Sequence, residues 1–530
     1  MNLASLILVP IIFGIILYKI PLKIGKVLLL LIQLYLGLTA VTLLFKSKSG
    51  VMIHEVLGGN DPILYIGLRG DRTALVFVCL SVFLFTMVFI YSLKDQFFDH
   101  KFALLFLVLQ GLLMGIFLTD DLFNLFVLLE VSTIVITVLI MLKKDDRSIY
   151  DGLFYLIIQI ISMMFFLFGI AYIYKIFGVL SIDEITKLLA TAVPQQSLFL
   201  PFAFLLTGIC LKIGFFPLFS WVPHSYGTPS TPFPVVAILS GLFVKSGLNL
   251  FIRLNTMFYP TLDFTLFFLT VGVLSGVLGF SKAITQKNMK LILAYSTISQ
   301  VGLITISTFM SSEIAYWGGM YHMLNHAVFK TLLFLSAGII AETYETTNVH
   351  EIRGVFKRMP VVGVTTLVAI LGMTGAPFFN GSVSKYWMMA GSSHPAIEGI
   401  LWTINIGTMV TYIRYAAILF GNSEVKAKTD GLKTGVLLFL SLICFLGGIF
   451  GKQTVDILFD VNLTIKLADY TVKGLIYPLI LVSGLIFYQK VILKVKRLES
   501  WGERSLSLPH SCLMLLAFFT SIMVYGLFLA

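Results

Sequence analysis

The chain of 530 residues is 58% hydrophobic and only 12% charged, which excludes a soluble enzyme or a soluble binding domain of this length. Apolar runs of about 18 to 25 residues recur from end to end, and each is long enough to cross the hydrocarbon core of a bilayer. The net charge of +11 comes from basic residues spread through short loops rather than gathered in one patch, so no nucleic-acid partner is expected. The composition predicts an all-α polytopic membrane protein.

About 16 transmembrane spans are predicted in chain order, and no loop between them is long enough to hold a soluble domain. The first has no basic region before it and no small-residue cleavage site after it, so it is predicted to be a retained helix. An amphipathic segment at 181–192 is expected to lie along the membrane interface. The predicted spans are 4–18, 27–45, 73–93, 102–118, 122–142, 153–177, 198–220, 232–253, 262–281, 288–310, 313–341, 361–391, 397–421, 432–450, 474–493 and 509–529.

Lysine and arginine predict the orientation of these spans, because loops rich in them stay on the inner side of the membrane. With the N-terminus outside, 22 of the 37 basic residues fall in inward loops and ten in outward loops. Seven of those ten lie in the two longest loops, 46–72 and 451–473, where the rule is weakest. Both termini are therefore predicted on the outer side of the cell (inner) membrane.

Several ionisable residues lie inside the predicted spans, where each costs free energy and where a functional role is the first hypothesis. Glu130 lies eight residues into its span, and the eleventh span carries three such residues at i, i+4 and i+8, on one helix face. A buried lysine beside a mobile carboxylate can take up and release a proton, and histidine titrates near physiological pH. The predicted proton-translocating residues are Glu130, Lys212, Lys245, His322, His326, Lys330 and Lys385.

Each of these residues also has a structural interpretation. A lysine can extend to the interface, an isolated histidine is usually a packing residue, and Arg414 can pair with a nearby carbonyl. His322 and His326 have the spacing of metal or haem ligands, but no further ligand completes a site. The four cysteines stand alone in apolar runs. No metal, no cofactor and no catalytic centre is predicted.

Two prolines interrupt spans beside these charges. Pro217 follows Lys212 in "LKIGFFPLFSW", and Pro377 precedes Lys385 in "MTGAPFFNGSVSKYW". Broken helices at matching places in two halves of a membrane protein indicate a transport site. The first break lies in spans four to eight and the second in spans nine to thirteen, and blocks of five helices have inverted topology. The predicted organisation is N-terminal helices (1–101), a first repeat (102–253), a second repeat (262–421) and C-terminal helices (432–530).

Six ordered motifs resemble the antiporter-like subunits of Mrp-type sodium/proton antiporters, respiratory complex I and membrane-bound hydrogenases. The resemblance covers about residues 60–425, and the Ser225-Tyr226 pair is similar to the D-type subunit of Mrp systems. The motifs are "LLEVSTIVI" around Glu130, "LKIGFFPLFSWVP" around Lys212, "LSGLFVKSGLNLFIR" around Lys245, "LAYSTISQVG" from Leu293, "HMLNHAVFKTLLFLSAG" from His322 and "TGAPFFNGSVSK" ending at Lys385.

The resemblance implies a Glu130–Lys212 ion pair, a central bridge of Lys245 and His326, and Lys385 as the terminal lysine. It also implies partner membrane subunits, transport of H⁺ and of Na⁺, and a 14-helix core. Val222 departs from the usual leucine, and two C-terminal spans exceed the customary fourteen and suit a docking extension. Three alternatives stay open: an Mrp-type antiporter subunit, a subunit of a redox-driven pump, and a non-transporting structural subunit.

Overall fold

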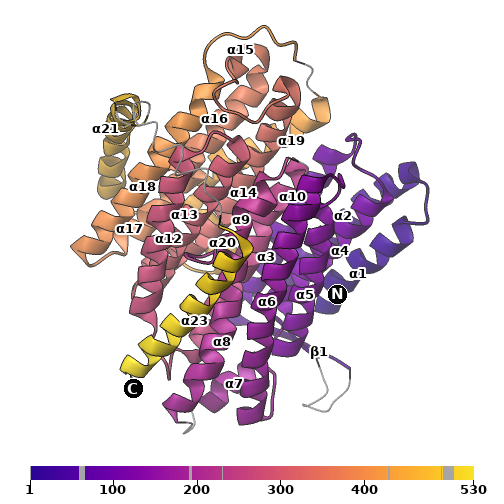
Figure 1. The fold of residues 1–530 in the computed structure, drawn as a ribbon, viewed down its shortest axis with the longest axis vertical. Helices are drawn as coiled ribbons and strands as arrows, with labels where there is room; N and C mark the ends of the chain where they lie inside the picture. The colour runs from indigo at the N-terminus through magenta and orange to yellow at the C-terminus, as the bar shows by residue number, and fades with distance from the viewer. Residues whose placement is uncertain are drawn as a thin grey trace.

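The computed structural model describes residues 2–58, 66–189, 194–229, 231–427, 430–490, 492 and 506–529. Within this part of the chain, fourteen helical spans are long and apolar enough to cross a membrane, which confirms the polytopic all-α prediction. They run side by side in one bundle (Figure 1). These spans are α2 (Leu22–Lys46), α3 (Arg72–Ser92), α4 (His100–Leu118), α5 (Leu122–Ile140), α6 (Asp146–Phe177), α8 (Gln195–Ile213), α10 with α11 (Phe233–Phe258), α12 (Thr265–Thr285), α13 (Met289–Phe309), α14 (Glu313–Tyr344), α18 (Pro395–Ala416), α19 (Gly431–Ile449), α21 (Leu467–Lys490) and α23 (Leu508–Leu529).

Shorter elements complete the bundle. Two further apolar helices are shorter: α1 (Leu3–Leu17) coincides with the predicted span 4–18, and α16 (Pro360–Thr374) forms the first half of the predicted span 361–391. The amphipathic segment is observed as α7 (Ile182–Leu189), and positions 190–192 lie outside the described residues. The remaining short helices are α9 (Trp221–Gly227), α15 (Val355–Arg358), α17 (Asn380–Ala390) and α20 (Gly451–Phe459).

One long loop contains a β-hairpin that the sequence pattern did not predict. Strands β1 (Ile53–Leu57) and β2 (Ile66–Gly70) pair antiparallel, with Ile53 opposite Gly70 and Leu57 opposite Ile66. The backbone N–H of Ala4 donates to Glu55 Oε2 at 3.2 Å, so α1 begins beside the hairpin. The hairpin and α7 lie at one end of the bundle and α15 at the other (Figure 1).

The two predicted helix breaks are present. The first separates α8 from α9, which lies after the predicted span 198–220, and the second divides the predicted span 361–391 into α16 and α17. α8 ends at Gly214 (φ 80°) before α9, and α16 ends at Gly375 (φ 81°) before α17. A left-handed backbone ends a helix, and glycine adopts it without a steric cost. Pro217 and Pro377 lie in the connections. The α8–α9 and α16–α17 pairs cross the bundle in opposite directions (Figure 1).

A third interruption was not predicted. Between α10 (Phe233–Ile238) and α11 (Val244–Phe258), residues 239–243 form one π-helical turn. A π turn disrupts the regular i→i−4 ladder and is frequent at functional sites. The turn lies directly before Lys245.

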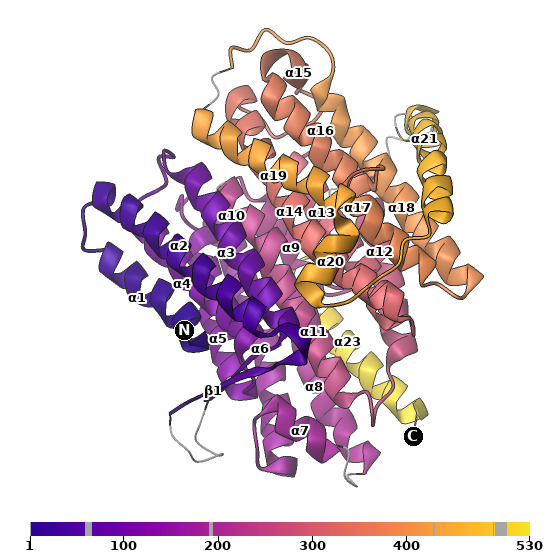
Figure 2. The same cartoon turned by 180° about the vertical axis from the view of Figure 1, so that it is seen from behind.

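The centre of the bundle is closely packed, whereas its last helices are peripheral. α10, α11 and α14 are buried almost throughout their length. α12 and α13 approach so closely that a Cβ on Gly302 would lie 2.3 Å from the backbone nitrogen of Gly276. By contrast, α21 packs on α18 and α23 on α8, both at the outside of the bundle (Figure 2).

Candidate proton-translocation site

The side chain of Lys212 reaches from α8 to α5. Its Nζ donates to Thr133 Oγ1 at 2.6 Å and to the Leu129 carbonyl oxygen at 3.3 Å, and it lies 5.8 Å from the centre of the Phe243 ring. Glu130 is half-buried and follows Leu129 directly. Within the described residues no Glu130–Lys212 ion pair shorter than 4.0 Å is formed, so Lys212 is held by neutral oxygens beside the carboxylate in this structure.

Lys245 and Lys330 are joined by a short series of hydrogen bonds across three helices. Lys245 Nζ donates to the Ser240 carbonyl oxygen of the π turn at 2.6 Å, and the Ser240 and Thr297 hydroxyls lie 2.9 Å apart. Thr297 Oγ1 donates to the Leu293 carbonyl oxygen at 3.0 Å, which also accepts from Lys330 Nζ at 2.7 Å. Both lysines are fully buried. Neutral oxygens on α10–α11 and α13 thus connect the two ammonium groups.

The two histidines of α14 lie close to these lysines. His322 Nδ1 lies 2.9 Å from Ser384 Oγ and His322 Nε2 lies 3.0 Å from Gln300 Oε1. The His322 and His326 ring centres are 6.2 Å apart. Among the described residues, neither nitrogen of His326 has a hydrogen-bond partner, although the ring is fully buried. Buried polar atoms without protein partners are usually satisfied by internal water.

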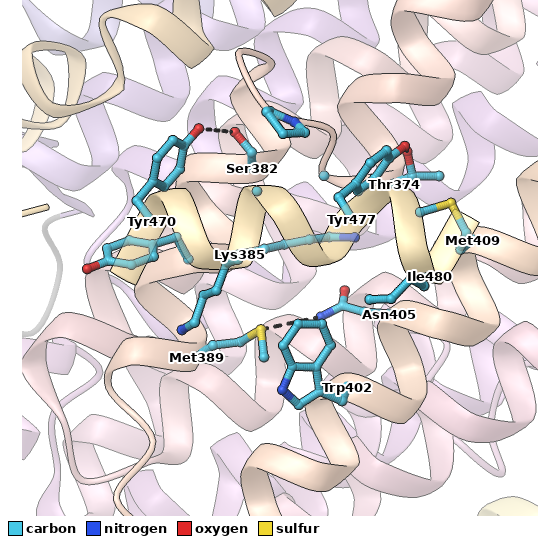
Figure 3. Close-up of a pocket in the computed structure, with 15 residues that line it drawn as sticks. Thr374, Ser382, Lys385, Met389, Trp402, Asn405, Met409, Tyr470, Tyr477 and Ile480 are labelled. Atoms are coloured by element: carbon cyan, nitrogen blue, oxygen red, sulfur yellow. Dashed lines mark hydrogen bonds between the residues drawn. The ribbon is translucent and has the colours of Figure 1, made fainter. Parts of the chain in front are cut away.

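Lys385 lies beside the second helix break and faces a cavity of about 80 Å³. Its Nζ donates to the Met373 carbonyl oxygen at 2.8 Å, one of the carbonyls that the end of α16 leaves without an intrahelical partner. Two tyrosines of α21 reach the two sides of the break: Tyr470 bonds Ser382 at 2.7 Å and Tyr477 bonds Thr374 at 2.8 Å (Figure 3). The cavity beside the terminal lysine is therefore covered by one of the C-terminal helices.

The seven predicted residues lie on α5, α8, α11, α14 and α17. Thr133 and Phe243 surround Lys212, Ser240 and Thr297 link the central lysines, and Ser384 adjoins Lys385. Glu130 forms no hydrogen bond within the described part of the chain, but it interacts electrostatically with Lys212. Arg414 is separate from this row: it donates to the Ile284 carbonyl oxygen and lies 3.2 Å from His350.

Sequence reasoning missed a buried pair, Asp151 and His224. His224 Nδ1 lies 2.7 Å from Asp151 Oδ1, and both side chains are buried. Asp151 comes in the second turn of a helix whose first turn is strongly polar, a pattern that is typical of a solvated helix end. His224 follows Pro223 in the break motif, where a single histidine gives no periodic signal.

At the end of the bundle that carries the hairpin, charged residues connect α4, α7 and α11. Arg253 Nη2 donates to the Thr119 carbonyl oxygen at 3.0 Å and lies 4.0 Å from Asp120, whose carboxylate accepts from Ser181 at 2.5 Å. Burial raises the pKa of Asp120, and the Ser181 hydroxyl and Arg253 partly oppose this shift. Arg69 pairs with Asp183 in the same cluster. These contacts hold the loop after α4, the start of α7 and strand β2 beside α11.

The helix bundle, its two broken helices and the lysines buried between them define a polytopic membrane protein with ionisable groups in its interior. Residues 119–411, more than half of the chain, match the family described as NADH:quinone oxidoreductase/Mrp antiporter, TM, and the chain belongs to this family. The family assignment drawn from the six motifs is confirmed.

Among curated relatives, the D-type subunit of the Na(+)/H(+) antiporter of Alkalihalophilus pseudofirmus is 28% identical over 425 residues, covering 77% of this chain and 83% of that protein. The N-type subunit of the NADH-quinone oxidoreductase of Desulforudis audaxviator is 29% identical over 326 residues, covering 60% of this chain and 64% of that protein. Each relative is one subunit of a larger complex, so these proteins belong to multi-subunit membrane assemblies.

Two solved structures share the fold. A chain of the membrane-bound sulfane sulfur reductase, an archaeal respiratory membrane complex, superposes with a TM-score of 0.80 at 26% identity, covering 86% of this chain and 96% of that chain. A chain of the Mrp complex from Dietzia sp. DQ12-45-1b gives a TM-score of 0.81 at 18% identity, covering 86% and 95%, a likeness of fold alone.

Proposed function

We propose that this protein is a proton- and cation-translocating subunit of a multi-subunit Mrp-type Na⁺/H⁺ antiporter. The observation that carries the proposal is the row of buried ammonium and imidazole groups held by neutral oxygens, from Lys212 through Lys245 and Lys330 to Lys385. An ammonium group in such a site has acceptors for its hydrogens but no fixed counter-charge. Such a lysine can therefore gain or lose a proton without the rearrangement of an ion pair.

The first lysine is suited to act as a gate. Lys212 bonds Thr133 and Leu129 on the same helix that carries Glu130, so a small movement of its flexible chain exchanges neutral partners for the carboxylate. Two unit charges 4 Å apart at an effective dielectric constant of 20 interact by about 4 kcal/mol. Forming or breaking the Glu130–Lys212 pair would thus change the electrostatic field at Lys245.

The onward path uses the connected hydroxyls. Between Lys245 and Lys330 lie the Ser240 and Thr297 hydroxyls, and water beside these hydroxyls would carry the proton past the carbonyl oxygens that bond the two lysines. His326 and His322 then lead to Ser384 beside Lys385. His326 lies within electrostatic range of Lys245, Lys330 and Lys385. Water at its unpartnered nitrogens would complete the connection between the central and terminal lysines. The lysine-rich loops would face the inner side of the cell membrane, with both termini outside.

The test is transport by the complete complex in membrane vesicles, with sodium and proton gradients imposed in turn. Lys212→Ala and Lys385→Ala should each lower the initial rate at least tenfold while the complex still assembles. Lys357→Ala is the matched control, because Lys357 is exposed and bonds Asn422 in a surface loop. Wild-type rates in both variants would contradict the proposal and support a purely structural subunit.

The second candidate is a subunit of a redox-driven pump, and the likeness to the sulfane sulfur reductase chain at 26% identity favours it. The buried row would conduct protons or sodium in the same way, but electron transfer in partner subunits would drive it. Neighbouring genes for iron–sulfur or nickel–iron subunits would support the pump. Genes for small Mrp-type membrane subunits alone would support the antiporter.

A further inference from the structure

A buried carboxylate–imidazole pair lies outside the row of lysines. Asp151, in the second turn of α6, is fully buried and accepts from His224 Nδ1 at 2.7 Å and Arg147 Nε at 2.9 Å. The Thr228 hydroxyl also donates to it. His224, on α9, stacks on the Phe154 ring with centres 4.0 Å apart. Both residues lie where α6 begins, at the end of the bundle that carries the lysine-rich loops, which we call the basic end.

The second nitrogen of the imidazole lies in the protein interior. An ionised Asp151 can only accept hydrogen bonds, so Nδ1 of His224 carries the hydrogen of this contact. His224 Nε2 is buried and has no hydrogen-bond partner in the part of the chain that the structure describes. It is therefore the atom of this pair that can bind and release a proton.

The unpartnered nitrogen is one of several buried polar atoms that lead toward Lys212. The hydroxyls of Tyr155, one turn after Asp151, and of Tyr226, on α9, also have no hydrogen-bond partner among the described residues. Tyr155 interacts electrostatically with Tyr226 and Glu130 and lies beside Thr133, the residue that bonds Lys212. Buried polar atoms without partners indicate internal water. Water at these atoms would connect the buried imidazole with the first lysine.

The two broken helices place His224 and Lys385 in related positions. His224 lies ten residues after Gly214, and Lys385 lies ten residues after Gly375. Both glycines end the first half of a broken helix with nearly equal φ, 80° and 81°. The α8–α9 and α16–α17 pairs run through the bundle in opposite directions, so His224 and Lys385 follow the breaks of two oppositely directed helices (Figure 1).

We infer that Asp151 and His224 form a proton-binding site at the basic-end entrance of the first repeat, which supplies Lys212. This inference rests on the proposed function and adds its point of proton entry. A proton from water binds at Nε2, the imidazolium is stabilised by Asp151, and the proton leaves from Nε2 through water toward Tyr155. No other bond forms or breaks.

The charges around the site suit this role. Arg147 and the tyrosines Tyr150 and Tyr155 face it from α6, and the Arg147 side chain is 63% exposed, so solvent reaches the edge of the site. From α13, Lys290 donates to the Thr228 and Thr231 carbonyl oxygens at 2.8 and 2.7 Å, and it interacts with Lys143. Without Asp151 these cations would oppose a charged imidazole. The carboxylate is therefore required for proton binding.

The experiment compares His224→Gln, Asp151→Asn and Tyr155→Phe in the assembled complex in vesicles, measuring proton transport while the pH at the basic-end face is varied. We expect at least a tenfold loss of rate for His224→Gln and Asp151→Asn. We also expect the dependence of the rate on the pH at this face to change in both variants. Tyr155→Phe should lower the rate several-fold. His394→Gln and Tyr344→Phe are the controls. His394 accepts from the Ala396 N–H at the start of α18, and Tyr344 donates to the Arg353 carbonyl oxygen, so neither side chain bonds a residue of α6 or α9.

If the other two variants fail to assemble, Tyr155→Phe tests whether protons reach Lys212 from the Asp151–His224 site. It removes only a hydroxyl, which lies beside Thr133 but forms no hydrogen bond of regular geometry with a described residue. If this hydroxyl carries no water toward Lys212, transport by Tyr155→Phe should be unchanged and its stability equal or higher. Unchanged transport in assembled His224→Gln or in Tyr155→Phe, together with an inactive Lys212→Ala, would contradict the inferred Asp151–His224 proton-binding site. It would not contradict the proposed function. Normal transport in Lys212→Ala as well would instead contradict the proposed function.

Discussion

At the scale of single residues, Lys330 illustrates how a charge is kept inside the bundle without a counter-ion. Its ammonium group donates to the Leu293 carbonyl oxygen at 2.7 Å, Ser296 Oγ at 2.5 Å and the Tyr412 hydroxyl at 3.2 Å. These three acceptors match the three hydrogens of the group. Such a site satisfies the hydrogen bonds of the charged form but leaves its desolvation uncompensated by an opposite charge.

Lys330→Met is therefore expected to abolish transport, with at least a tenfold loss of rate, while the free energy of unfolding stays the same or rises. Methionine fills a similar volume without a buried charge, and replacing buried charges by apolar side chains is often neutral or stabilising. Transport in vesicles and thermal unfolding of the purified complex measure the two effects. A strong loss of stability together with normal transport would show that Lys330 is a structural residue.

At the scale of secondary-structure elements, the site depends on places where helices are interrupted. The break after α16 supplies the Met373 carbonyl oxygen to Lys385, and the π turn places the Ser240 carbonyl oxygen at Lys245. In an unbroken helix these oxygens would be occupied by backbone N–H groups four residues further on. The interruptions thus supply neutral acceptors to Lys245 and Lys385.

Gly375→Ala should destabilise the protein by about 1–2 kcal/mol, because alanine is strained in the left-handed region that Gly375 occupies at φ 81°. Its Cβ would also lie 3.0 Å from Lys385 Cδ, so transport should fall as well. Gly435→Ala, in α19 with no neighbour within 4 Å of the new Cβ, is the control and should be neutral or slightly stabilising. Thermal unfolding compares the pair; equal transitions would show that the break tolerates other backbone angles.

At the scale of the whole molecule, charged contacts at the basic end join helices that are far apart in sequence. Lys433 of α19 pairs with Asp95 at 2.6 Å and Glu342 at 3.1 Å. Asp430, the N-cap of α19, accepts from the Leu432 backbone N–H at 2.7 Å and pairs with Lys94 at 3.2 Å. These contacts connect the C-terminal helices with the loop between α3 and α4.

Asp430→Ala should lower stability by about 1 kcal/mol at neutral pH through loss of the helix cap. The Leu432 N–H and Lys94 lower the pKa of Asp430 in the folded state. The stabilisation is therefore present above the ordinary aspartate pKa of about 4 and disappears as the pH falls through the folded value. Unfolding temperatures of the two proteins should differ at pH 7 and converge below about pH 3. A difference independent of pH would contradict this contribution of the ionised carboxylate.

Much of the architecture was predictable from the sequence, because the apolar length needed to cross a bilayer is a local property. The spans, the amphipathic helix α7 and the breaks at Pro217 and Pro377 follow from runs of residue types. The β-hairpin was missed because its strands are short and lie in a long polar loop. The π turn was missed because residues 239–243 have the same apolar pattern as a regular helix.

The sequence alone determined that this chain is a polytopic membrane protein with ionisable residues inside its spans, since an exposed charge in lipid is costly wherever it lies. Only the tertiary structure decided which groups meet. Asp151 and His224 are 73 residues apart, and Lys330 and Tyr412 are 82 apart, so no local pattern records their contact. The packing of α5, α6, α9, α13 and α14 brings these side chains together, and it places neutral oxygens rather than carboxylates on the buried lysines.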